Sequence, residues 1–445
     1  MGNDADKIMA GTAIGIAKQT GIDIVQDGDV IAWAGAYGGN IKPKGPLAGK
    51  KIGLIVASEF SDFQAYYLAS YIGEFGGKCE FLLVDWVTWK FVRPNIANKG
   101  VRGMWDLSVD PIPVMGGNKA ALFRSLKDAK PEDYDALVIL GGHSADVMVT
   151  EAQVIEFIKA AANNGALIGG IAAGLMPMIS AGLMKGKKCT GDRTVDYMLR
   201  KIARFESAPV ITDGKIITAR ATVDTPAFLR ALCQEFDPGF VDSWKDILAG
   251  RRVMLLVGGD FEDIELVVPT MELLHRGAEL IIGKFPPEMT SRPPLLGLDI
   301  IMGNFGVSIP FQEIPECYYT IKNLADIKMS EFDVTVITGA FNPWNIVATG
   351  TSDWLKEAMA AGKTIAAICH GAIPLAAADL ISGKKVTGWL ACKDSVEIMG
   401  GEFRSEEWAA AIQGQIVTGR TPPEIPEFLD AISVALISGD RPSLI

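Results

Sequence analysis

Residues 364–371 read Thr364-Ile365-Ala366-Ala367-Ile368-Cys369-His370-Gly371. The apolar run before the cysteine is short, as in a central strand of a parallel sheet, and the residues after Gly371 have a helical composition. This pattern predicts a strand, a sharp turn and a helix, with Cys369 at the turn as a nucleophile. The first N–H groups of the helix would favour the thiolate form. The alternative is a buried structural cysteine, which is the commoner fate of a lone thiol.

The two halves of the chain repeat each other at a distance of roughly 200 residues, which indicates a tandem duplication of two domains. The segments of the first half have counterparts in the same order in the second half: residues 51–62 match the segment that contains Glu262, 168–177 match the Cys369 turn, 186–191 match 383–388, and 217–220 match 417–420.

Three motifs of the second half resemble those of the ThiJ/PfpI family, a branch of the class I glutamine amidotransferase-like superfamily. They are residues 366–371 followed by 383–388, residues 253–266, and residues 417–422. The resemblance implies two tandem flavodoxin-like α/β/α sandwiches with parallel sheets, and a site at the carboxyl ends of the strands. We expect a helical and Gly-rich extension at 1–49, a first domain with a degenerate turn at 50–245, and a nucleophile-bearing domain at 250–445.

The two repeats have lost different parts of a catalytic site. The first repeat has Ala172-Ala173 at the turn, and Ser61 where the second has Glu262. It keeps Asp146, which the family resemblance identifies with a carboxylate that orients the catalytic histidine from a neighbouring subunit. The second repeat has Trp344 at that position. We therefore predict a composite site of Cys369, His370, Glu262 and Asp146, formed within one chain or between chains.

The resemblance also assigns roles around the nucleophile. Glu262 matches the buried carboxylic acid of the family, and burial beside the thiol should raise its pKa and keep it protonated. Backbone N–H groups of Gly339, Ala340 and His370 are expected to stabilise an oxyanion. Other pocket candidates are Trp344 and His143. The alternative for Glu262 is an acid that is favourable only at a helix N-terminus, and the alternative for Asp146 is a surface acid in a loop.

Composition limits the partners. The net charge is −11, and there is no basic run, which argues against nucleic acid and anionic membranes as partners. The six cysteines and three histidines show no metal-ligand spacing, so we expect reduced thiols, no metal and no cofactor. The first residues lack the pattern of a secretory signal, which predicts a cytoplasmic protein. We expect a homo-oligomer whose tandem repeats mimic the family dimer, with a trimer of chains as one assembly.

The leading functional prediction is a cofactor-independent cysteine enzyme that acts on a small carbonyl compound. It resembles the glyoxalase III members of the family, which convert 2-oxoaldehydes to 2-hydroxy acids. One alternative is a cysteine amidase or peptidase of the PfpI type that uses Cys369, His370 and Asp146. The other is a non-enzymatic redox sensor or holdase whose Cys369 oxidises.

Overall fold

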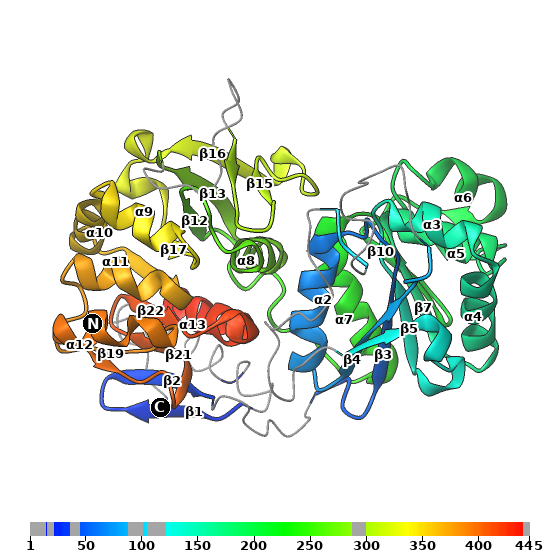
Figure 1. Ribbon diagram of the computed structural model, residues 1–445, viewed down its shortest axis with the longest axis horizontal. Helices are drawn as coiled ribbons and strands as arrows, with labels where there is room; N and C mark the ends of the chain where they lie inside the picture. The colour runs from blue at the N-terminus through cyan, green and yellow to red at the C-terminus, as the bar shows by residue number, and fades with distance from the viewer. Residues whose placement is uncertain are drawn as a thin grey trace. The chain divides into compact units, whose positions relative to one another are not determined.

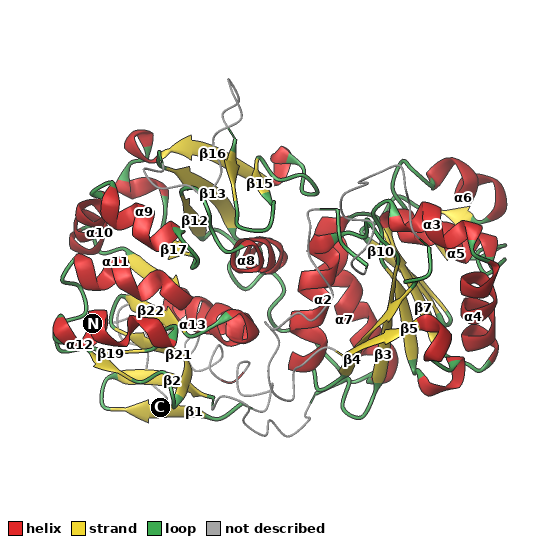
Figure 2. Cartoon of the chain, in the orientation of Figure 1, coloured by secondary structure: helices red, strands yellow, loops and turns green. Residues whose placement is uncertain are grey.

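The computed structural model describes residues 15, 22–35, 45–87, 101–104, 122–286 and 300–438. The chain forms two compact units, Lys42–Asp242 and a second unit that combines Met1–Ile41 with Ser243–Ile445. Each is an α/β unit built on a mostly parallel sheet (Figures 1 and 2). The predicted fold class, two tandem flavodoxin-like units, is confirmed. No helix within the described ranges is long and apolar enough to cross a membrane.

The first unit contains a seven-stranded sheet in the order β10-β11-β7-β6-β3-β4-β5, in which only the edge strand β10 is antiparallel to its neighbour. Helices α2 and α7 cover one face, and α3, α4 and α5 cover the other (Figure 1). The strands are β3 (Lys51–Val56), β4 (Lys78–Leu83), β5 (Leu122–Ser125), β6 (Ala136–Ile139), β7 (Leu167–Ile171), β10 (Val210–Asp213) and β11 (Ile216–Ala219), with β8 (Lys188–Cys189) and β9 (Arg204–Phe205) in a separate ladder. The helices are α2 (Asp62–Glu74), α3 (Ser144–Thr150), α4 (Ala152–Asn163), α5 (Leu175–Ser180), α6 (Asp196–Ile202) and α7 (Thr225–Phe236).

The second unit repeats this topology and adds two strands, giving the order β1-β2-β21-β22-β18-β17-β12-β13-β16. Its strands are β12 (Arg252–Val257), β13 (Glu279–Lys284), β16 (Tyr319–Asn323), β17 (Val334–Ile337), β18 (Thr364–Ile368), β21 (Trp408–Gln413) and β22 (Ile416–Gly419), with short ladders of β14 (Ile301–Met302) and β15 (Ser308–Ile309), and of β19 (Lys385–Val386) and β20 (Glu402–Phe403). Its helices are α8 (Asp263–His275), α9 (Asn342–Ala348), α10 (Thr351–Ala360), α11 (Ala372–Ala377), α12 (Lys393–Ile398) and α13 (Ile425–Ser438). Because β7 and β18 hold the same place in the two sheets, the Ala172 and Cys369 turns are structural equivalents.

The two added strands come from the N-terminal segment, within the predicted helical and Gly-rich extension at 1–49. Strands β1 (Ile24–Asp27) and β2 (Val30–Ala34) form a hairpin, and β2 pairs antiparallel with β21 of the second repeat. The Lys385 ammonium lies 2.6 Å from the Asp27 carboxylate, and Arg420 donates to the Gly35 carbonyl at 2.7 Å. The first repeat is therefore inserted, in sequence, between two parts of one sheet. The helix expected before residue 22 lies outside the described residues, apart from Gly15.

We predict that Trp33→Ala destabilises the second unit by about 3–5 kcal/mol, because this β2 side chain is fully buried and its removal leaves a large cavity. Urea unfolding measures the change. Val25→Ala, on the neighbouring strand at 38% exposure, is the matched control and should cost under about 1 kcal/mol. An unchanged unfolding midpoint for Trp33→Ala would show that the hairpin does not unfold with the sheet.

Candidate active site

Cys369 lies at the predicted turn between β18 and α11, and its backbone is left-handed, with φ of 61°. The equivalent Ala172 of the first repeat has φ of 52°. A left-handed conformation costs a residue with a side chain about 1 kcal/mol, so it persists only where the surrounding fold imposes it. Both repeats thus keep the strained turn, although only the second carries a nucleophile. In the first repeat, a cysteine equivalent to Cys369 would stand at position 172, where the chain has alanine.

Glu265 is the carboxyl group that contacts Cys369. It is fully buried on α8, it is close enough for the Cys369 side chain to lower its pKa, and its Oε2 accepts a hydrogen bond of 2.5 Å from the Gly339 amide. A Cβ atom at Gly339 would lie 2.7 Å from this Oε2 and 2.9 Å from the Cys369 sulfur. The Glu265 carboxyl, the Cys369 sulfur and the Gly339 backbone therefore lie so close together that a side chain at position 339 would not fit.

The prediction that Glu262 occupies this place was wrong by one helical turn. Glu262 is the residue that precedes the first turn of α8, it is partly exposed, and its side chain does not cap the helix. Burial, followed by the charges of Glu265 and Asp263, raises the pKa of Glu262 well above the ordinary value. The shift has the direction that the sequence predicted. Glu262 remains close enough to raise the pKa of Cys369. The contact with the sulfur belongs to Glu265.

The first repeat shows which position is equivalent to Glu265. Gln64 on α2 accepts a hydrogen bond of 2.8 Å from the Gly141 amide, as Glu265 does from Gly339. Its Nε2 donates to Thr222 Oγ1 at 2.9 Å. The first repeat therefore retains the shape of the site, but the Gln64 amide replaces the Glu265 carboxyl. This amide cannot exchange a proton as a carboxyl can.

The pKa of the Cys369 thiol is raised well above its ordinary value, by burial first and then by the charges of Glu265 and Glu262. A hydrogen bond from the His370 amide acts in the opposite direction. The first N–H groups of the helix therefore act in the expected direction, but burial and the two carboxylates outweigh them. Burial also raises the pKa of Glu265 to about 8. We expect Cys369 and Glu265 to share one proton after the first deprotonation, with the tautomer that has a thiolate and a neutral acid as the reactive one.

This coupling predicts that the alkylation rate of Cys369 rises with an apparent pKa of about 8, the value for Glu265, because loss of the first proton creates the shared-proton state. Iodoacetamide labelling between pH 5 and 10, followed by mass mapping, tests this. The exposed Cys317 should be replaced by Ser, since it competes for the reagent. A midpoint at or below pH 6 would contradict the coupling.

His370 lies against the nucleophile, with its Nδ1 3.4 Å from the Cys369 sulfur. Burial lowers its pKa, so the imidazole is neutral at pH 7 and can accept the thiol proton. Its ring is 5.0 Å from the ring of Trp344 and 6.1 Å from that of Trp389. The structure thus brings the predicted pocket residue Trp344 to His370. It adds Trp389, which the sequence analysis did not identify.

The Gly339 amide does not serve as a free oxyanion donor in this structure, because it donates to Glu265. The prediction for Gly339 is corrected accordingly: it holds the acid in place. Ala340 has φ of 57° where the first repeat has Gly142 at 84°, so the turn is kept at the cost of local strain. The roles of the Ala340 and His370 amides in stabilising an oxyanion stay predictions.

Asp146 and His143 lie in the first unit, at the beginning of α3. The His143 Nδ1 is 3.8 Å from an Asp146 carboxylate oxygen, and the two side chains are 67% and 48% exposed. His143 is thus a neighbour of Asp146 within its own unit. The composite triad joins Asp146 to residues of the other unit and stays a prediction.

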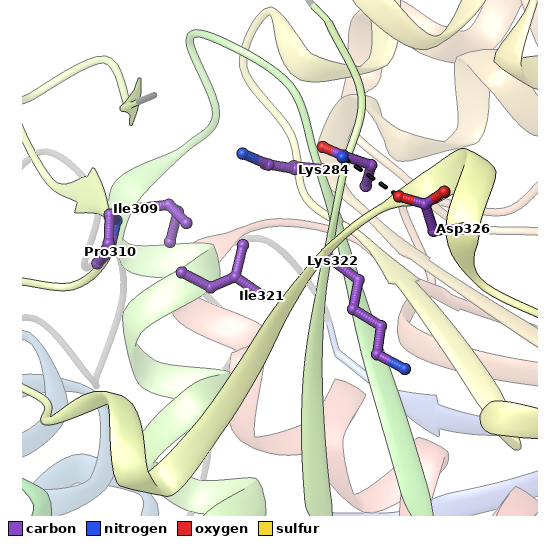
Figure 3. Close-up of a pocket in the computed structure, with 7 residues that line it drawn as sticks. Lys284, Ile309, Pro310, Ile321, Lys322 and Asp326 are labelled. Carbon is purple, nitrogen blue, oxygen red and sulfur yellow. Dashed lines mark hydrogen bonds between the residues drawn. The ribbon is translucent and has the colours of Figure 1, made fainter. Parts of the chain in front are cut away.

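A separate pocket of about 570 Å³ lies where β13 and β16 end (Figure 3). Asn323 donates a hydrogen bond to Asp326 at its edge. None of the predicted site residues lines it; the lining residues are Lys284, Ile309, Pro310, Ile321, Lys322, Asn323 and Asp326. In the part of the chain that the structure describes, no group of three or more His, Cys, Asp or Glu residues could hold a metal ion.

The chain is thus a tandem α/β protein with two flavodoxin-like sheets. Each sheet has a strained turn after a central strand, and the turn of the second repeat carries a cysteine beside a buried carboxyl. The model of the DJ-1/PfpI family matches residues 50–235 and again 251–435. The chain belongs to this family, and the resemblance to ThiJ/PfpI proteins is confirmed.

Individual proteins are similar to this chain in sequence or in structure. The chain is 27% identical to Protein DJ-1 homolog D of Arabidopsis thaliana over 72% of its own length and 82% of that protein. It is 29% identical to Protein/nucleic acid deglycase 2 of Escherichia coli, over 40% of this chain and 93% of the relative. Among solved structures, Drosophila melanogaster DJ-1beta matches with a TM-score of 0.35 and 18% identity, over 42% of this chain and 90% of that one.

Proposed function

We propose that the protein is a cofactor-independent cysteine enzyme that converts a 2-oxoaldehyde to a 2-hydroxy acid. The observation that carries the proposal is the pair formed by Cys369 and Glu265, a candidate nucleophile and a carboxyl of pKa about 8 that both lie against Gly339. Such a pair holds an acid that is neutral near pH 7 and can both give and take a proton during one reaction. The similarity to a relative named as a deglycase supports a cysteine enzyme of this family.

The proposed reaction begins when the Cys369 thiolate adds to the aldehyde carbon and the Glu265 proton goes to the resulting oxygen. This step gives a neutral hemithioacetal and a Glu265 carboxylate. The carboxylate takes the hydrogen from the former aldehyde carbon and returns it to the neighbouring carbon, while the hydroxyl proton moves to the second oxygen. The product is a thioester of the 2-hydroxy acid. Water then hydrolyses the thioester, releasing the acid and returning a proton to the sulfur.

His370 has two roles in this scheme. As a neutral imidazole 3.4 Å from the sulfur, it can accept the thiol proton before attack and activate the water that hydrolyses the thioester. The same geometry serves amide hydrolysis, in which Cys369 would form an acyl-enzyme. The difference lies in Glu265, because a hydrolase needs no acid that moves a proton between adjacent carbons.

The test is an assay of the purified protein with 2-oxoaldehydes and with small amides, followed by measurement of the 2-hydroxy acid and of released ammonia. We expect 2-hydroxy acid from the 2-oxoaldehydes, with no turnover of the amides. Ammonia release without 2-hydroxy acid would replace the proposal with a hydrolase. Absence of both, with Cys369 found oxidised after peroxide treatment, would favour the redox sensor.

The composite triad predicts that Asp146→Asn lowers turnover by about 10-fold or more, because the change preserves shape and removes the charge that would orient His370. Glu156→Gln, another exposed acid of the same unit, is the control and should leave turnover unchanged. Equal activity of the two variants would leave Cys369, His370 and Glu265 as the complete site.

A further inference from the structure

Exposed aromatic rings lie beside His370 in the candidate site. Phe341, Trp344 and Trp389 are 47%, 37% and 39% exposed, and we call these three residues the aromatic cluster. The ring centroids of Phe341 and Trp344 are 5.3 Å apart. The His370 ring lies near both indoles, 5.0 Å from the ring of Trp344 and 6.1 Å from the ring of Trp389. Large aromatic side chains in solution-facing positions, gathered around one histidine, are unusual for a surface without a ligand.

The aromatic cluster is fixed to the nucleophile through two independent contacts. The amide of Trp389 donates a hydrogen bond of 3.0 Å to the carbonyl of Cys369. On the other side, Trp344 packs on the His370 ring, whose Nδ1 is 3.4 Å from the Cys369 sulfur. When a substrate reacts with the Cys369 sulfur, the part of the substrate that is not bonded to the sulfur therefore lies beside the indoles.

The first repeat provides an internal comparison. Alignment of Gly141 with Gly339 and of Gly191 with Gly388 places polar residues at all three equivalent positions: His143 for Phe341, Asp146 for Trp344 and Asp192 for Trp389. In the first repeat, the equivalent pair at the beginning of α3 is an exposed histidine 3.8 Å from an aspartate; in the second, it is a pair of aromatic rings. The rings thus occur in the repeat that carries Cys369 and Glu265. The repeat with Ala172 and Gln64 lacks them, which links the cluster to the reaction.

We propose that the aromatic cluster binds a flat aryl group of the substrate, so that the preferred substrates are aryl-bearing carbonyl compounds. This inference rests on the proposed function and names its substrate class. Offset or edge contacts with the two indoles would hold the aryl ring, while its carbonyl carbon reaches the sulfur. An alkyl group of similar reactivity gains less from the indoles, because it has no π-face to stack.

The experiment measures the preference in two ways. First, kcat/KM is determined for phenylglyoxal and methylglyoxal, corrected for their intrinsic reactivity with a free thiol. Second, alkylation of Cys369 by N-phenyl-iodoacetamide and by iodoacetamide is compared in the Cys317→Ser protein. We expect both aryl-to-alkyl ratios to exceed the free-thiol ratio, and Trp344→Ala and Trp389→Ala each to lower them by about five-fold. Tyr197→Ala removes a 62% exposed ring of the first unit and should leave both ratios unchanged.

The outcomes separate this inference from the proposed function. If no 2-oxoaldehyde is turned over but the alkylation ratio is high and falls in the tryptophan variants, the proposed reaction is wrong and the aryl site stands. If turnover occurs with aryl-to-alkyl ratios equal to those of a free thiol, the aryl site is wrong and the proposed reaction stands. Variants that change the oligomeric state while both ratios stay constant would instead identify the cluster as a contact between copies of the chain.

Discussion

Cys369→Ala should reduce turnover to the uncatalysed background, a loss of at least about 10³-fold, because every later step of the reaction starts from the bond that this sulfur forms. The fold should be unaffected, since Ala172 adopts the same left-handed turn in the first repeat with a methyl side chain. Steady-state kinetics with a 2-oxoaldehyde measure the loss, and the circular dichroism spectrum of the variant checks the fold.

The first repeat supplies the matched control. Ala172→Cys in the Cys369→Ala protein restores a thiol at the equivalent turn, yet we expect no recovery of activity, because Gln64 cannot transfer a proton as Glu265 does. Adding Gln64→Glu restores the acid but not the histidine, since Ala173 stands in the place of His370. Activity in Cys369→Ala alone would place the chemistry at another residue.

The parts of the structure that the sequence predicted correctly are those set by local pattern. An apolar run followed by Cys369 and Gly371 constrains a strand and a turn within a few residues, and the repeat transfers that interpretation to Ala172. The hairpin of β1 and β2 also had a local signal, the Gly28-Asp29 pair that forms its two-residue loop. Its partner strand β21 lies near the other end of the chain, and nothing local indicates that pairing.

The errors concern side chains whose role depends on packing. Glu262 and Glu265 are one helical turn apart, and the sequence alone does not show which of them faces the sulfur. Alignment with Gln64 could have indicated Glu265, because glutamine preserves the shape of glutamate. The occupied Gly339 amide and the raised pKa of Cys369 follow from the same buried carboxyl, so both corrections have one physical origin.

Glu265→Gln should lower turnover by about 10²–10⁴-fold, because it removes the group that carries a proton between the two carbons in the proposed reaction. The site should keep its shape, since Gln64 makes the same hydrogen bond with Gly141 that Glu265 makes with Gly339. Loss of the nearby negative charge removes one cause of the raised pKa of Cys369, so its alkylation at pH 7 should be retained or become faster. Slow turnover combined with a reactive thiol is the signature of a missing proton carrier, and a collapsed site would lose both.

Glu262→Gln is the control for this experiment, because it changes a carboxyl one turn away that does not contact the sulfur. We expect turnover within about 10-fold of the unmodified protein, together with a lower apparent pKa of alkylation, since the charge of Glu262 contributes to the raised pKa of Cys369. Should Glu262→Gln abolish turnover while Glu265→Gln retains it, the acid of the reaction would be Glu262, and the contact between Glu265 and Cys369 would be structural.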